Sequence, residues 1–271
     1  VCPSFPVLLL LLFWSLLLLF PLGALAHGRW LLPDALLLQA WLPWHDAVFS
    51  GNSVAWFLSA LVLCYCAFPL LARAVAAAPW RLCLLAVAAM AALQCALVQW
   101  VGGDAAYTFP LSRIQDFALG VVLCRLARSR HTAGKATSWQ LLAVAIVAVA
   151  MAVSWLWPER LAGYDSVVLW WLPVAAVLMA FSLDGGWPAK LMAHCAPLQW
   201  VGAMSMEVYA LQCVAPQVWN RVLAPVAAHF GWAGAYRHYA LPSVALLLVL
   251  AWAARKYVTA PLWRKLGMRH D

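Results

Sequence analysis

Charged side chains are scarce in this 271-residue chain: 10% of the residues are Asp, Glu, Lys or Arg, whereas a soluble domain has about 25%. Hydrophobic residues make up 67% of the chain. This composition excludes the soluble classes, and 18 Trp, 10 Phe and 7 Tyr exclude a disordered chain. What is left is an all-α, polytopic integral membrane bundle in the lipid bilayer, long enough for roughly eight spans of ~20 residues.

Metal and nucleic-acid motifs are also missing. The 8 Cys show no Cys-x-x-Cys or Cys/His zinc spacing, so we expect no metal site and no resident cofactor. The formal net charge of +8 comes from Lys and Arg that flank the apolar runs, which is the ordinary topogenic pattern, so we expect no nucleic-acid partner. No inverted repeat of the kind found in secondary transporters is visible.

Eight apolar runs bounded by charges, Pro and Gly are long enough to predict membrane spans, at about 5–26, 53–72, 82–101, 111–127, 138–157, 166–182, 199–222 and 239–256. The segment 27–52 is interrupted by Pro33, Pro43 and His45, and it contains three Trp. Since indole rings favour the headgroup level, we expect this segment to lie along the outer interface.

Eight spans place both ends of the chain on one side of the membrane. With a cytoplasmic start, twelve of the Lys and Arg residues fall in inner loops and the tail, against five on the outer side. Cytoplasmic loops carry the excess of positive charge, so we expect both termini in the cytoplasm and the protein in the inner (plasma) membrane.

Three of the charged residues within predicted spans stand out, because each charge in the hydrocarbon region costs on the order of 2.5–3.5 kcal/mol and needs a structural or functional reason. Arg113 and Asp116 are three residues apart, hence on one helix face. They form either a structural pair or a polar contact with substrate. Glu207 lies near the inner end of its span, where we expect it to snorkel to water.

A second polar stripe begins at the outer end of the next predicted span. Asn52, Trp56 and Ser59 recur at helical spacing, and Tyr65 follows further along the span. The stripe is either a helix N-cap at Ser53 with an aromatic belt residue or part of a substrate path. Ser59 would be a nucleophile only with a base beside it, and no histidine falls within a predicted span.

Three segments in the same order resemble motifs of the membrane acyltransferase-3 family, whose members O-acylate lipopolysaccharide O-antigen, exopolysaccharides and similar glycans. They are 38–71, with Trp-Phe-Leu-Ser-Ala-Leu at 56–61; 109–120, with Pro-Leu-Ser-Arg-Ile-Gln-Asp-Phe at 110–117; and 198–209. The second has Asp116 where the family pattern has Glu. In the third, Met206 replaces a Tyr, and Gln212 stands where the family has a late His.

The resemblance implies ten spans in a complete member, with an essential His on the first. The opening Val-Cys-Pro at 1–3 resembles the end of a motif that precedes the third family helix. We therefore expect residues 1–271 to form a single acyltransferase-3-like transmembrane domain, N-terminally truncated by two helices, with the catalytic His outside this chain.

The function implied by the resemblance is transfer of an acyl group, expected to be acetyl, from cytoplasmic acyl-CoA to a hydroxyl of a cell-surface glycan or lipid-linked saccharide. Arg113 and Asp116 are the expected catalytic-site organisers. The expected substrate-binding residues are Asn52, Trp56, Ser59, Tyr65, Ser205 and Tyr209. Two alternatives stay open: a transporter or flippase of lipid-linked sugars, and an inactive truncated remnant. The sequence does not indicate the oligomeric state.

Overall fold

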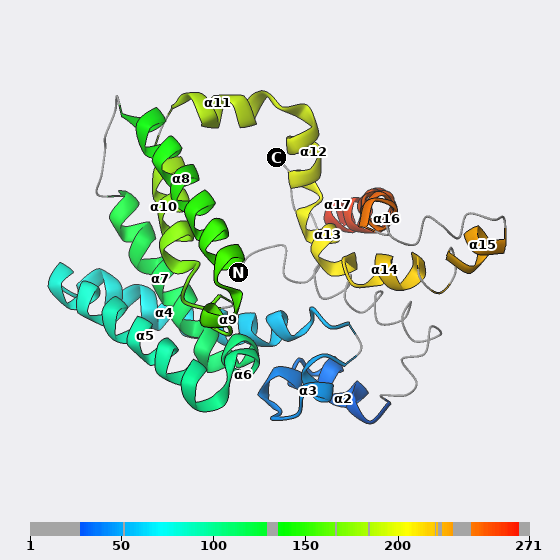
Figure 1. The fold of residues 1–271 in the computed structure, drawn as a ribbon, viewed down its shortest axis with the longest axis horizontal. Helices are drawn as coiled ribbons and strands as arrows, with labels where there is room; N and C mark the ends of the chain where they lie inside the picture. Colours follow the sequence, from blue (N-terminus) through cyan, green and yellow to red (C-terminus); the bar gives the residue numbers. More distant parts are fainter. Residues whose placement is uncertain are drawn as a thin grey trace. The chain divides into compact units, whose positions relative to one another are not determined.

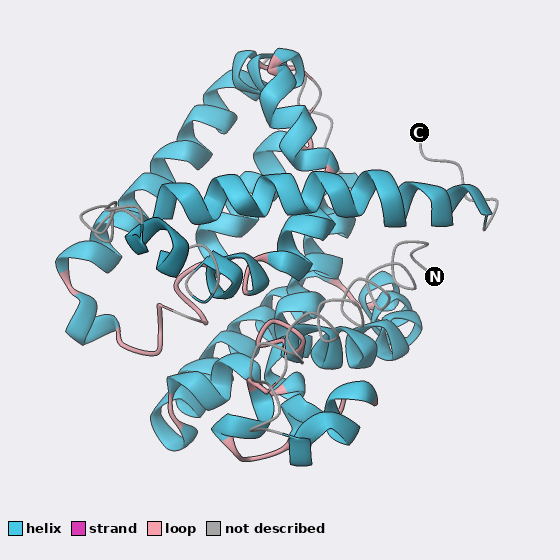
Figure 2. Cartoon of the chain, turned by 90° about the vertical axis from the view of Figure 1, so that its right-hand side faces the viewer, coloured by secondary structure: helices cyan, strands magenta, loops and turns pink. Residues whose placement is uncertain are grey.

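The structure is a computed structural model that describes residues 28–50, 52–128, 135–165, 167–183, 185–219, 221, 224–229 and 240–265. Within these ranges the chain forms helices, turns and loops and contains no strand, which confirms the all-α prediction (Figures 1 and 2). The chain divides into two compact units. The first comprises residues 1–58 and 197–271, and the second comprises residues 59–196.

The second unit contains most of the long helices. These are α4 (Trp56–Ala77), which starts three residues before the unit boundary, α5 (Trp80–Val101), α7 (Pro110–Arg128), α8 (Ala136–Leu156) and α10 (Trp171–Phe181). Four short helices connect or end them: α6 (Gly103–Thr108), α9 (Pro158–Leu161), α11 (Trp187–His194) and the start of α12 (Ala196–Ala203). Helix α10 packs against α8 and α7, and α5 packs against α6 and α7 (Figure 1).

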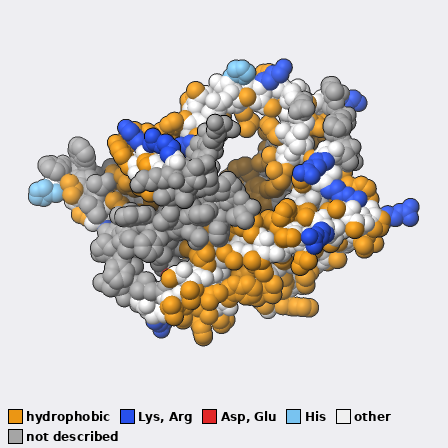
Figure 3. Space-filling view, turned by 180° about the vertical axis from the view of Figure 1, so that it is seen from behind, with side chains coloured by type: hydrophobic (Ala, Val, Ile, Leu, Met, Phe, Trp, Pro, Cys, Tyr) orange, Lys and Arg blue, Asp and Glu red, His pale blue; other side chains and the backbone are white. Residues whose placement is uncertain are grey.

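Three of these helices, α4, α5 and α8, are long and apolar enough to cross a membrane, with mean hydropathies of 1.9, 2.1 and 2.1. Their surfaces carry large apolar side chains, such as Trp100 at 79% exposed and Trp155 at 82% exposed. Hydrophobic side chains also dominate much of the face drawn in Figure 3. Large exposed apolar surfaces on a helical protein are typical of contact with lipid.

The predicted count of eight spans stays a prediction. The run 5–26 lies outside the described residues. Helix α10 has 11 residues, which is about 16 Å of helix and shorter than the ~30 Å hydrocarbon core. The predicted span 199–222 is not one helix: it divides into α12, α13 (Ser205–Leu211) and α14 (Val214–Val218). Gly202 precedes the first break, and Pro216, which has no N–H to donate, follows the second.

The first unit is built from shorter elements. The segment 28–50 contains α2 (Leu31–Ala35), the 3₁₀ helix η3 (Gln39–Trp41) and α3 (His45–Val48), none of which is long enough to span a bilayer. Helices α13 and α14 pack against α16 (Ala240–Ala254), which continues through the π-helical turn η6 (Arg255–Thr259) into α17 (Ala260–Lys265). Helix α15 (Ala224–His229) completes the described elements.

Arg125 fixes the end of α4 rather than acting only as a topogenic charge. Its guanidinium donates to the carbonyl oxygens of Val75 and Ala78, the latter at 2.7 Å, and it lies 5.1 Å from the ring centre of Trp80. The last carbonyl groups of a helix have no partner within the helix, so a cation from a neighbouring helix stabilises them. This contact holds the C-terminal ends of α4 and α7 together.

Two glycines bring α6 against the loop that follows α9. A Cβ on Gly103 would overlap the backbone of Gly163, and Gly163 itself has a φ of +84°. Around this contact Val98, Ala106 and Val167 form a buried apolar cluster. The close approach therefore positions α6, whose residues contact the polar cluster described below.

We expect Gly103→Ala to destabilise the second unit by about 1–3 kcal/mol, because the added methyl group meets backbone that cannot rotate away. The matched control is Gly120→Ala, since a Cβ at Gly120 meets nothing within 4 Å. Thermal unfolding of the purified variants in detergent measures both. Equal melting temperatures for the two variants would contradict the close approach.

Asp34 links α2 to the end of the 28–50 segment and is buried. The Ser50 hydroxyl lies 2.8 Å from Asp34 Oδ1 and 2.6 Å from the Ala47 carbonyl oxygen, and it donates to one of them at a time. Burial raises the pKa of Asp34 to about 6, although the Ser50 hydrogen bond opposes the rise. Protonated Asp34 can donate to Ser50 while Ser50 donates to Ala47.

A carboxyl group whose pKa is raised by folding binds its proton more tightly in the folded state. Its contribution to stability is therefore complete below pH 3.8 and is lost as the pH rises through about 6. We expect the melting temperature of the wild-type protein to fall across this window. We expect Asp34→Asn, which keeps an uncharged partner for Ser50, to flatten this dependence. Parallel pH slopes for the two proteins would rule out Asp34 as the titrating group.

Candidate functional site

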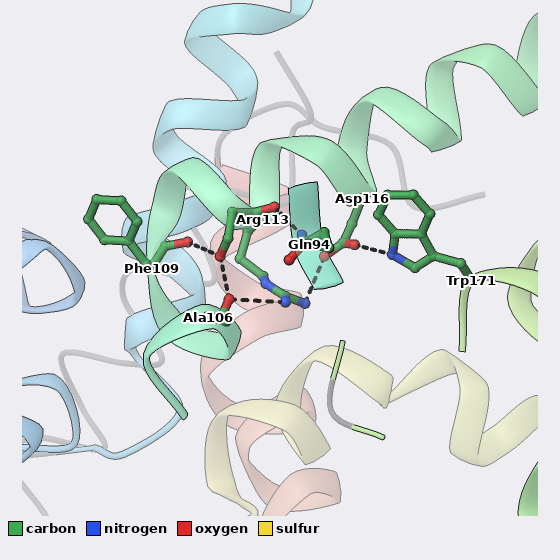
Figure 4. Close-up of polar contacts among 7 residues, drawn as sticks. Gln94, Ala106, Phe109, Arg113, Asp116 and Trp171 are labelled. Carbon is green, nitrogen blue, oxygen red and sulfur yellow. Dashed lines mark hydrogen bonds and ion pairs between the residues drawn. The ribbon is translucent and has the colours of Figure 1, made fainter. Parts of the chain in front are cut away.

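A polar cluster is built around one turn of α7. Arg113 Nη1 lies 2.7 Å from Asp116 Oδ2, an ion pair between residues one helical turn apart, as their spacing predicted. The indole Nε1 of Trp171, on α10, donates to the other carboxylate oxygen, Oδ1, at 2.6 Å (Figure 4). Both oxygens of Asp116 are thus engaged, and the carboxylate is fixed between two helices.

The end of α6 holds Arg113 from the other side. Arg113 Nη2 donates to the Ala106 carbonyl oxygen at 3.3 Å, and the guanidinium lies 5.2 Å from the ring centre of Tyr107. The Ser112 hydroxyl also approaches the Ala106 carbonyl (Figure 4). Carbonyl groups in the last turn of a helix lack partners within it, so the short helix α6 supplies acceptors for both side chains.

Gln94 ties α5 to the same cluster, because its Nε2 donates to the Ser112 carbonyl oxygen at 2.8 Å. Three buried polar atoms of this region have no hydrogen-bond partner: Gln94 Oε1, Gln115 Oε1 and Arg113 Nε. Buried polar atoms without a partner are rare in folded proteins, and each one calls for a bound water or ligand to satisfy it. The cluster therefore has unused hydrogen-bonding capacity.

Two of the predicted substrate-binding residues lie in the second unit with Arg113 and Asp116. The Tyr65 ring, on α4, lies edge-on to Phe117 with centres 6.4 Å apart, so Tyr65 lies beside the α7 segment that contains Asp116. Ser59 is buried, and its hydroxyl has no hydrogen-bond partner among the described residues. Within that part of the chain no base contacts Ser59, as a nucleophile would require.

The other four predicted residues lie in the first unit, where Asn52 and Tyr209 come together. Asn52 is fully buried, and its Nδ2 donates to the Ala210 carbonyl oxygen at 2.9 Å. The Tyr209 hydroxyl donates to the Val54 carbonyl oxygen at 2.9 Å. The segment 52–54 and α13 therefore meet through two hydrogen bonds.

The remaining two predicted substrate-binding residues differ from each other in exposure. Trp56 is buried against Ala40 and Val48, whereas Ser205, at the start of α13, is exposed.

The expectation that Glu207 snorkels to water is wrong, since only 2% of this residue is exposed. The packing of α13 against α16 covers the helix, and a pattern read along one helix does not show such a neighbour.

Sequence reasoning missed Trp171 and Gln94. Trp171 stands in an apolar run next to Trp170, so nothing local separates it from a belt residue. Gln94 did carry a signal: it is an amide inside an otherwise apolar helix, fully buried, where a polar side chain needs a partner. Its partner, the Ser112 carbonyl, became visible only with the packing of α5 against α7.

The geometry favours different roles for Arg113 and Asp116. Arg113 is a positioned cation whose Nε has no protein partner, so it can stabilise negative charge that develops on an oxygen atom. Both oxygens of Asp116 are engaged, Oδ2 by Arg113 and Oδ1 by Trp171, so the carboxylate fixes the position of the Arg113 guanidinium. Tyr65 adds an aromatic surface beside them.

A family model described as an acyltransferase domain, acyltransferase-3, matches residues 5–256 of the chain. The match covers nearly the whole sequence, including all eight predicted site residues. No curated protein and no solved structure matches the chain.

We expect Asp116→Asn to destabilise the second unit by about 1–3 kcal/mol, because Arg113 is left in an apolar environment without its counter-charge. The double variant Arg113→Gln/Asp116→Asn should regain part of this loss, since it removes both charges. Chemical denaturation of wild type, both single variants and the double variant measures the coupling. Additive losses would show that the ion pair does not contribute to stability.

Proposed function

The chain belongs to the acyltransferase-3 family of membrane acyltransferases, and from this premise we propose that it transfers an acyl group from acyl-CoA to a glycan hydroxyl. The acyl group we propose is acetyl. The acceptor is a hydroxyl of a cell-surface glycan or a lipid-linked saccharide. We place the protein in the inner (plasma) membrane with both termini cytoplasmic, because the Lys and Arg excess of the predicted loops favours that side.

In this reaction the acceptor hydroxyl oxygen attacks the thioester carbonyl carbon, and the carbonyl oxygen becomes negatively charged in the tetrahedral intermediate. The C–S bond then breaks, and the thiol of coenzyme A leaves with a proton. The acceptor hydroxyl must lose its proton to a general base, for which the resemblance implies a histidine. The developing oxyanion needs a fixed donor, and such donors typically contribute about 10²–10³ in rate.

The observation that supports this proposal is the fixation of Arg113. Its guanidinium is held by Asp116 at 2.7 Å and by the Ala106 carbonyl at 3.3 Å, and Asp116 is in turn held by Trp171. A cation positioned before the substrate arrives stabilises a transition state without the cost of reorganising. We assign Arg113 to the oxyanion and Asp116 to its orientation.

The remaining assignments concern the acceptor. We propose that Tyr65 and Ser59 lie along its path in the second unit. In the first unit, taken by itself, we propose Asn52, Trp56, Ser205 and Tyr209 as candidate acceptor contacts. Aromatic faces and unpartnered hydroxyl groups are typical of sugar-binding surfaces. The unpartnered Ser59 hydroxyl and the exposed Ser205 are the groups in this set most open to such a contact.

We expect Arg113→Gln and Asp116→Asn, made in the full-length gene product, to lower acyl transfer by about 10²-fold or more. The O-acyl content of the surface glycan is measured in cells that carry each variant as the only copy. Arg160→Gln is the matched control, because Arg160 is an exposed cation on α9 outside the cluster. The Arg113→Gln/Asp116→Asn variant should be as inactive as either single variant although better folded. Normal acylation at normal membrane levels would remove both residues from the site.

A further inference from the structure

A groove of about 570 Å³ runs between α4 and α7 in the second unit. Its walls are apolar and include Phe68, Ala72 and Val75 from α4 with Phe117, Gly120 and Val121 from α7. Charged groups occur only at its two ends: Asp116 at one, and Arg125 and Arg128 at the other. Such a lining favours a hydrocarbon chain, because a polar chain would leave its amide groups without hydrogen-bond partners.

Gly120 keeps this groove open. A Cβ built on Gly120 meets nothing within 4 Å, and its backbone does not have the positive φ that favours glycine. Glycine inside a helix lowers helix stability by roughly 1 kcal/mol relative to alanine, so it usually occurs where a close contact or an unusual backbone angle requires it. Neither applies here, and the effect of the missing side chain is open space in the groove wall.

The basic end of the groove lacks neutralising charge. Arg125 is engaged with the carbonyl groups at the end of α4. Arg128 is exposed and makes no ion pair within the described part of the chain. No Asp or Glu occurs in the segments 59–103 and 117–158. Arg73 lies near the C-terminal end of α4, and Arg81 lies near the N-terminal end of α5, which follows it in the chain. This end of the second unit therefore attracts anions.

The length of the groove corresponds to one leaflet of a bilayer. Phe117 and Arg128 are eleven residues apart on α7, which is about 16 Å at the rise of an α-helix. Half of the ~30 Å hydrocarbon core is close to this value. A lipid with its phosphate beside Arg128 therefore has room for one extended acyl chain as far as Phe117.

We propose that the α4–α7 groove binds an anionic phospholipid, with one acyl chain along the groove as far as the packed Phe68 and Phe117 rings and the phosphate on Arg128. Basic pockets between membrane helices are known to bind anionic headgroups. The groove ends beside Asp116 of the proposed acyl-transfer site, but the lipid proposal does not rest on the acyl-transfer chemistry. The apolar walls favour a lipid over the donor's pantetheine arm, which carries amide groups.

The test uses purified full-length protein, delipidated in mild detergent and mixed with phosphatidylglycerol or phosphatidylcholine. Native mass spectrometry counts the lipid molecules retained. We expect wild type to retain one phosphatidylglycerol in preference to phosphatidylcholine. Gly120→Leu, whose Cβ meets nothing within 4 Å and whose side chain extends the groove wall, should lose it. Arg128→Gln should lower retention about fivefold, as expected for one basic residue at a membrane surface.

Two controls match these changes. Gly202→Leu places the same side chain on α12, where a Cβ also meets nothing within 4 Å, and Arg160→Gln removes an exposed Arg of α9 that does not line the groove. Both should retain the lipid. If thermal unfolding shows that Gly120→Leu is not folded, Ala72→Leu replaces it in the test, because this change narrows the groove from the opposite wall.

Three results would overturn the proposal. Equal retention by wild type, Gly120→Leu and Ala72→Leu would show that the lipid lies elsewhere. Equal retention of phosphatidylcholine would show that Arg128 does not select an anionic headgroup. Displacement of phosphatidylglycerol from wild type by acetyl-CoA would assign the groove to the acyl donor. None of these results depends on measured acyl transfer.

Discussion

The need to satisfy buried charge in apolar surroundings governs the second unit. Arg113 has Asp116 one helical turn away, and Asp116 is completed by Trp171 on α10. The Ala106 carbonyl at the end of α6 accepts from Arg113 in turn. Because an unpaired charge would cost several kcal/mol here, the positions of α6, α7 and α10 are linked through one ion pair. The proposed catalytic cation is thus also a structural one.

The same constraint acts at the opposite end of α7. Arg125 satisfies carbonyl groups at the end of α4, while Arg128, one turn further on, makes no ion pair within the described residues. Helix α7 therefore has an ion pair near its start, a cation bound to carbonyl groups near its end, and a cation without an ion-pair partner among the described residues at its last residue. These three arrangements correspond to the candidate site, the α4–α7 junction and the proposed lipid site.

Local sequence patterns predicted several long helices and the ion pair on α7. The apolar runs predicted α4, α5 and α8, and the spacing of Arg113 and Asp116 predicted their ion pair, because both depend on helix geometry within one segment. The division of 199–222 into three helices and the burial of Glu207 were not predicted. Hydropathy summed along a window contains neither the breaks near Gly202 and Pro216 nor the packing of α13 against α16.

The sequence by itself determined that the chain is a helical membrane protein of the acyltransferase-3 family, since composition and motif order are properties of the linear chain. Only the tertiary structure decided what holds the charges. Trp171 and Gln94 are 55 and 18 residues from their partners Asp116 and Ser112, respectively. The open groove beside Gly120 likewise exists only between two packed helices. Contacts between distant segments depend on how helices pack, and local periodicity carries no record of that packing.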